Sequence, residues 1–194
     1  MSMSKPPRSA MSVRDMAGAV GVLVVLALVV AGLGRACTFA PGGPQVDQSA
    51  TPTIDAPADL ARFAKEVPFP VRVPAVPAGW RANSSGIDRV GGDSTARVVR
   101  VGYLTAEHRF VRLLQGDVPE EQMLRVQTGT KAVGAVGPVD VAGTRWVVYG
   151  GQGRDEPIWI ADTGGARYLI TGSADEPDFR ALAQAVQTGQ VAAR

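Results

Sequence analysis

The amino-acid sequence predicts an α+β protein, with an N-terminal transmembrane helix followed by an extracytoplasmic antiparallel sheet packed with two or three helices. Three observations support this fold class. An uncharged apolar stretch of 19 residues lies near the N-terminus. Further along the chain, strand-like segments follow one another through short loops, which favours antiparallel pairing. Amphipathic helical segments begin and end the region that holds these strands.

The first element is the apolar stretch of residues 16–34, MAGAVGVLVVLALVVAGLG. A helix of this length spans roughly 28 Å, which is close to the thickness of the hydrocarbon core of a bilayer. Three basic residues precede it, and Arg35 directly follows it. Because positive charge favours the cytoplasmic side, we expect a single-pass protein of the plasma membrane, with residues 1–15 in the cytoplasm and the C-terminal domain outside.

Two other interpretations of this segment stay open. A cleaved signal peptide has a shorter apolar core, of roughly 7–15 residues, and the cut would follow Ala36. A lipoprotein would carry acyl groups on Cys37, but here Arg35 lies two residues before the cysteine and Leu33 lies four before it instead of three. A retained anchor is therefore favoured, and it leaves Cys37 as a single thiol outside the membrane.

Residues 35–54 are rich in Pro, Gly, Ser and Thr and show no apolar period, which is typical of a flexible linker. The extracytoplasmic domain then covers residues 55–188, and residues 189–194 form a short C-terminal tail. A domain of about 135 residues is long enough to bury one hydrophobic core.

The domain is expected to begin with a short helix that Asp55 caps, with Pro57 in its first turn. Its apolar stripe has helical spacing and consists of Leu60, Phe63, Ala64 and Val67. The following residues, 68–80, contain four prolines and should be extended, at the edge of a sheet or outside it.

Three hairpins follow. Their strand pairs are 97–104 with 109–115, 139–141 with 145–149, and 158–161 with 167–171. Val99, Val101 and Tyr103 share one face of the first strand and Arg100 takes the other, as an antiparallel sheet with one polar face requires.

Two further helices are predicted among and after these strands. Residues 119–128 form a short one. The last helix follows Ser173, which makes a capping box with Glu176, and it ends at Gly189. Its buried stripe consists of Phe179, Leu182, Ala183 and Val186.

The composition excludes several classes of site. The chain has one cysteine and one histidine, so it holds no intramolecular disulfide, Cys/His zinc cluster, iron–sulfur ligand set or two-histidine metal site. Residues 1–35 carry a net charge of +3 and the remainder −1, so the domain has no basic footprint for nucleic acid. We expect no metal and no cofactor.

The order and spacing of several short motifs resemble an uncharacterised actinobacterial family of single-pass membrane proteins, the domain of unknown function DUF4245. These motifs are Arg14-Asp15-Met16, Val76-Pro77-Ala78-Gly79-Trp80-Arg81, Val101-Gly102-Tyr103-Leu104-Thr105, Gln115, Gly143-Thr144-Arg145-Trp146 and Leu169-Ile170-Thr171-Gly172. They cover most of residues 12–188. The resemblance supports the topology and implies no activity, substrate or site residue.

No catalytic residue is predicted. The single histidine, His108, falls in a hairpin loop, and the chain has no Gly-x-Ser-x-Gly elbow that would present a nucleophile to it. Residues 150–154 are rich in glycine but precede a strand, whereas phosphate loops precede a helix. A carboxylate-dependent hydrolase is kept as an alternative, with these acids as candidates: Asp155, Glu156, Asp162, Glu120 and Glu121.

Trp146 and Trp159 are the candidate ligand-binding or partner-binding residues. Each points to the opposite face from its strand neighbours, so the two share one face of the sheet. That face is either covered by helices or exposed as a patch. The leading hypothesis is a non-catalytic binding or accessory module of the cell envelope, whose partner is a protein or another envelope component. The alternative is a pocket that binds a lipid or another apolar ligand.

Overall fold

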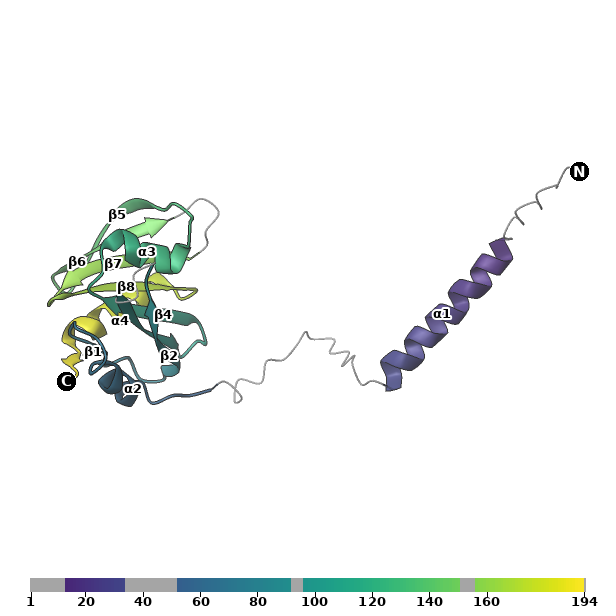
Figure 1. Ribbon diagram of the computed structural model, residues 1–194, viewed down its shortest axis with the longest axis horizontal. Coiled ribbons are helices and arrows are strands. Elements are labelled where there is room, and N and C mark those ends of the chain that lie inside the picture. Colours follow the sequence, from purple (N-terminus) through teal and green to yellow (C-terminus); the bar gives the residue numbers. More distant parts are fainter. Residues whose placement is uncertain (1–12, 34–51, 92–95, 151–155, 194) are drawn as a thin grey trace, which may run out of the picture. The chain divides into compact units, whose positions relative to one another are not determined.

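The computed structural model describes residues 13–33, 52–91, 96–150 and 156–193 (Figure 1). The chain divides into two compact units, residues 1–48 and residues 49–194. The expected cytoplasmic tail up to residue 12, most of the linker, Cys37 and Asp155 lie outside the described residues.

The part of the first unit that the structure describes is the helix α1 (Val13–Leu33). Its described residues are apolar on all sides, and their large side chains are half or more exposed, with Val22 at 68% and Leu23 at 66%. Among the residues that the structure describes, no helix is both long enough and apolar enough to cross a membrane.

The second unit is built on a seven-stranded antiparallel sheet in the order β2-β3-β4-β8-β7-β6-β5. Its strands are β2 (Arg81–Arg89), β3 (Arg97–Leu104), β4 (Phe110–Gly116), β5 (Gly134–Val141), β6 (Thr144–Gly150), β7 (Ile158–Thr163) and β8 (Ala166–Gly172). The three predicted hairpins are all present, as β3–β4, β5–β6 and β7–β8.

The sheet consists of two meanders that meet in its centre. The first runs β2-β3-β4 and the second runs β5-β6-β7-β8, and the pairing of β4 with β8 joins them. Between the meanders the chain passes from the middle of the sheet to its far edge, and helix α3 (Glu120–Thr128) lies in this crossover.

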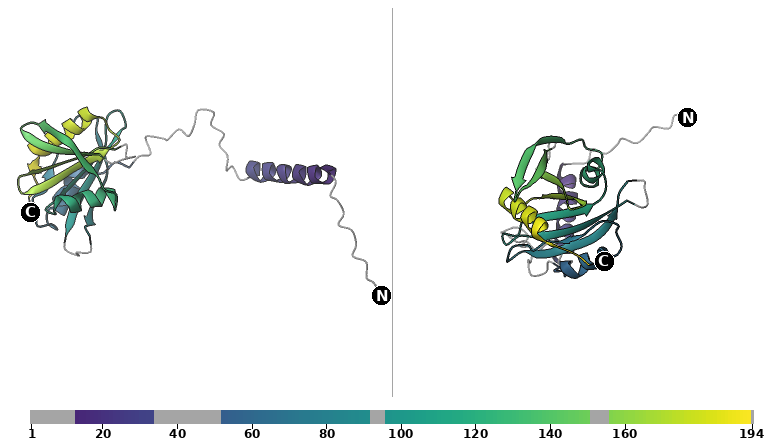
Figure 2. Two further views of the ribbon diagram at one scale, coloured as in Figure 1. Left: turned by 90° about the horizontal axis from the view of Figure 1, so that it is seen from above. Right: turned by 90° about the vertical axis from the view of Figure 1, so that its left-hand side faces the viewer.

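Helices cover both faces of the sheet (Figure 2). Helix α2 (Ala56–Phe63) contacts β2 and β3, and helix α4 (Glu176–Thr188) contacts β8 and the edge strand β5. Because β8 and β5 are three strands apart in the sheet, the second meander curls around α4. A separate two-stranded ribbon pairs β1 (Arg72–Val73) with β9 (Gln190–Val191).

Each face has its own buried cluster, as the alternation of apolar residues along the strands dictates. The larger cluster lies under α2 and α4 and includes Val99, Val101 and Tyr103 of β3. The smaller one lies under α3 and includes Met123, the buried residue of that helix, with Leu169 of β8.

A buried glutamine fixes the ribbon against the sheet. The Gln115 carboxamide accepts a hydrogen bond from the Arg72 backbone nitrogen at 2.8 Å and donates one to the Arg72 carbonyl oxygen at 2.9 Å. Gln115 is fully buried at the end of β4, so these bonds satisfy its polar atoms and both backbone groups of Arg72. The Arg72 guanidinium then donates to the carbonyl oxygens of Gln187 and Gly189, at the end of α4.

One predicted helix cap is confirmed, and three other local details differ from the prediction. Asp55 caps α2 as expected, through a 3.0 Å bond from the Ala58 nitrogen. The capping box at the start of α4 is wrong, because Asp175 holds the N-cap position and the Ser173 hydroxyl instead accepts a bond from the Phe110 nitrogen. Strand β2 was not predicted, and residues 190–191 of the expected tail form β9.

We expect Gln115→Leu to lower the free energy of unfolding by about 2–4 kcal/mol, since the Arg72 backbone groups would stay buried without partners. Urea denaturation of the full chain measures this loss. Gln184→Ala is the matched control, because Gln184 is exposed on α4 and its loss should change stability by less than about 0.5 kcal/mol. Equal effects of the two changes would contradict the role given to Gln115.

Candidate binding groove

The structure buries both candidate tryptophans. Trp146 is fully buried and Trp159 is 3% exposed, and both belong to the larger cluster, on the face covered by α2 and α4. They share this face, as the strand alternation predicts. Ile158 and Ile160, the neighbours of Trp159 in sequence, lie in the cluster on the opposite face. Neither tryptophan forms part of an exposed apolar patch.

Trp159 nevertheless forms the floor of an open groove of about 350 Å³. We call it the Trp159 groove. Its other walls are the edge strand β5, strand β6 and the first turn of α4. The lining residues are Val136, Gly137, Pro138, Val139, Val148, Pro157, Trp159, Glu176 and Phe179.

Two local features shape this groove. The pairing of β5 with β6 skips Val136, which bulges outward and is 75% exposed. Pro138 follows on the same edge strand, where its missing N–H leaves no ladder hydrogen bond unmade. Both features lie on the part of β5 that lines the groove, and the first turn of α4 lines it from the other side.

Helix α4 forms the opposite wall, and Arg180 ties it to β5. The Arg180 guanidinium pairs with Glu176 at 2.8 Å and donates to the Asp140 carbonyl oxygen at 3.2 Å. It also lies 5.9 Å from the centre of the Trp159 ring, while Phe179 packs against the same indole with 5.5 Å between ring centres. The groove thus has an apolar floor and one paired charge cluster at its rim.

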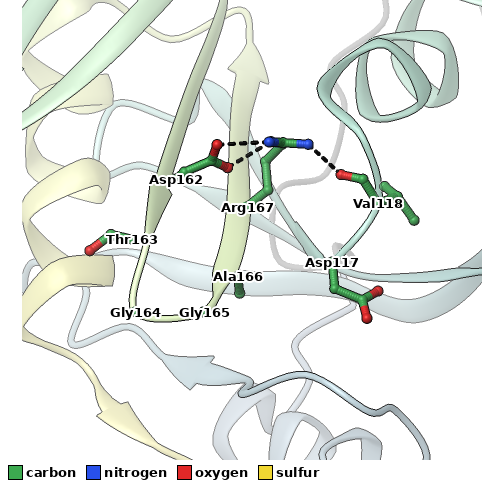
Figure 3. Close-up of a pocket in the computed structure, with 8 residues that line it drawn as sticks. All are labelled: Asp117, Val118, Asp162, Thr163, Gly164, Gly165, Ala166 and Arg167. Atoms are coloured by element: carbon green, nitrogen blue, oxygen red, sulfur yellow. Dashed lines mark hydrogen bonds and ion pairs between the residues drawn. The ribbon is translucent and has the colours of Figure 1, made fainter.

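A second hollow, of about 450 Å³, lies beside the β7–β8 hairpin (Figure 3). Two of its charged residues, Asp162 and Arg167, are paired with each other. The Arg167 guanidinium donates to both carboxylate oxygens of Asp162, at 2.6 and 2.7 Å, and to the Val118 carbonyl oxygen at 2.5 Å. These contacts fasten the start of the crossover to the hairpin, so we assign this hollow a structural role.

The other acids considered for a hydrolase are dispersed. Glu120 accepts a hydrogen bond from the Tyr149 hydroxyl, and Glu121 pairs with Arg125 along α3. Glu156 is half-buried just before β7. Asp162 lines the second hollow together with Asp117, but the Asp162 carboxylate is paired there with Arg167. Groups of three or more potential metal ligands are also not found among the described residues.

His108 lies exposed in the β3–β4 turn, where it has a positive φ of 62°. This turn connects the sheet to helix α4. Next to the histidine, Arg109 pairs with Asp175 at 2.5 Å and with Asp178 at 3.0 Å, which holds the first turn of α4 in place.

The fold and the groove together define a helix-covered antiparallel domain with an open apolar hollow at one edge of its sheet. Residues 8–186 match the model of the family described as Protein of unknown function (DUF4245), and the chain belongs to this family. The resemblance found in the motifs is confirmed to that extent. No curated protein and no solved structure matches the chain.

The Tyr149 hydroxyl of β6 donates a hydrogen bond to Glu120 of α3, and this contact predicts a loss of stability at high pH. Burial, and secondarily the hydrogen bond to Glu120, raise the pKa of Tyr149 to about 12. Since this pKa lies above the ordinary value of 10.0, the folded state favours the protonated phenol. Its stabilising effect is complete below about pH 10 and is lost as the pH rises toward about 12.

Urea denaturation at several alkaline pH values tests this expectation. Tyr149→Phe should lose less stability than the unmodified chain between about pH 10 and 12, because it lacks the ionising group. Glu120→Gln should bring the pKa of Tyr149 closer to its ordinary value, as read from phenolate absorbance. Glu121→Gln is the control on the same helix, and it should leave that pKa unchanged.

Proposed function

We propose that the chain is a membrane-anchored, non-catalytic binding module of an actinobacterial cell envelope, and that the Trp159 groove receives an apolar side chain of a partner protein. The observation that carries this proposal is the groove itself, with its floor of Trp159 and Phe179 and its paired rim charges Glu176 and Arg180. An apolar centre with a polar rim is the usual anatomy of a protein interface.

The shape of the groove favours a protein over an enclosed small ligand. It opens to solvent along β5, and it is continuous with Val136, whose side chain is 75% exposed. A site for a lipid or another small apolar molecule typically encloses most of its ligand. A projecting side chain of a partner fits an open groove that has an exposed apolar shoulder.

Residues 16–34 support the membrane anchor. They contain no charged residue, and α1 exposes apolar side chains such as Leu23 and Leu26, at 66% and 60%. A helix that is apolar on all sides requires an apolar environment, which a bilayer provides. The proposed orientation places the N-terminus in the cytoplasm and the second unit outside.

A photoreactive amino acid at position 136 of the full-length chain, introduced in the producing cells, tests the groove. We expect it to crosslink one partner protein reproducibly, whereas the same probe at Val191, which is 54% exposed on β9, should not. Gly137→Leu should reduce this capture roughly tenfold, the effect of losing about 1.4 kcal/mol of binding, because its side chain would fill the groove.

Gly134→Leu is the matched control for that substitution. Both glycines lie on β5 with open space where a Cβ would be added, but Gly134 does not line the groove. Capture should stay within about twofold in this variant. If Gly137→Leu leaves the capture unchanged, the groove is not the binding site. Capture of lipid instead of protein would support the alternative function, the binding of a lipid.

The single cysteine, Cys37, reports the orientation of the anchor. A maleimide reagent that does not cross membranes should label intact cells at this thiol, and the labelled chain should remain in the membrane pellet after alkaline carbonate extraction. Cys37→Ser provides the unlabelled control. Labelling only after permeabilisation would reverse the orientation, and release of the chain from the pellet would indicate cleavage.

A further inference from the structure

A row of residues crosses the sheet on the face that α3 covers. Directly paired positions on neighbouring strands place their side chains on the same face. The pairs Gly102 with Arg112, Arg112 with Thr171, and Thr171 with Ile158 therefore form one row across β3, β4, β8 and β7. Ile158 belongs to the smaller cluster, which identifies this as the α3 face.

Arg112 has no counter-ion in this row. Its guanidinium makes one hydrogen bond to the described residues, from Nη1 to the Gln127 side chain of α3 at a long 3.4 Å. The guanidinium also lies 5.3 Å from the centre of the Phe110 ring, and its Nε is buried without a hydrogen-bond partner among the described residues. By contrast, Arg100, on the same face of β3, pairs with Asp88 at 2.8 Å.

Thr171 supplies a second unsatisfied group next to it. Its side chain is 1% exposed, and its hydroxyl has no hydrogen-bond partner in the described part of the chain. An unpaired buried hydroxyl costs about 1–3 kcal/mol, whereas valine would have the same shape without this cost. Thr171 lies directly opposite Arg112, for which the described residues provide no counter-ion, and this arrangement indicates that both groups serve a third one.

We propose that Arg112 and Thr171 bind an oxyanion, a carboxylate or a phosphate group. Such an oxygen can accept hydrogen bonds from the Arg112 guanidinium and from the Thr171 hydroxyl, and its negative charge neutralises the arginine. Arg112 is half-buried, so its outer edge provides the route from solvent. The site lies on the opposite face of the sheet from the Trp159 groove and does not depend on it.

The nitrogen–proton NMR signal of the Arg112 Nε group in the full-length chain, held in neutral detergent, tests the proposal directly. Arg112→Lys identifies this signal by its loss. Inorganic phosphate and acetate are the probes, and one or both should shift the signal saturably, whereas chloride at equal ionic strength should not. The probe that binds more tightly assigns the phosphate or the carboxylate class.

Thr171→Val should weaken the binding of that probe roughly tenfold, by removing one donor, while the fold stays intact. Arg100→Gln is the control, because Arg100 lies on the same face but is already paired with Asp88. The Arg100→Gln variant should bind the probe as tightly as the unmodified chain. An Arg112 signal that neither anion moves, or equal binding in Thr171→Val, would show that the two groups hold only water.

Discussion

The two hydrogen bonds between the Gln115 side chain and the Arg72 backbone join the β1–β9 ribbon to the main sheet of the second unit. They attach β1 to the centre of the sheet without extending the sheet itself. Because β1 pairs with β9 and Arg72 also caps the end of α4, the same contact fixes where the last helix can lie. The position of α4 then determines how far the second meander curls, and the Trp159 groove lies inside that curl.

The hairpins were predictable because strict alternation of apolar and polar residues defines a strand before any partner is known. Strand β2, RANSSGIDR, lacks this signal: its serines and glycine have low strand propensity, and it pairs because β3 presents a complete edge. The N-cap of α4 was mispredicted for a similar reason. Ser173 has the right spacing to Glu176, but the tertiary contact with the Phe110 nitrogen takes its hydroxyl.

The candidate site was predictable only in part. Alternation along β6 and β7 places Trp146 and Trp159 on one face, as the structure has them. The groove depends on a bulge at Val136 and on a helix that returns from far along the chain, and neither has a local signature. The Arg112–Thr171 pair requires the register between β4 and β8, two strands whose paired residues are far apart in sequence, so sequence alone did not reveal it.

The central pairing of β4 with β8 has a consequence for how the chain is synthesised. The first meander can form as soon as residue 116 is available, but the free edge of β4 must then wait until β8 has been made. During that interval β4 presents unpaired backbone groups and apolar side chains to any neighbouring strand. Non-local pairing also closes slowly. The nascent second unit is therefore most exposed to aggregation while the ribosome translates residues 117–172.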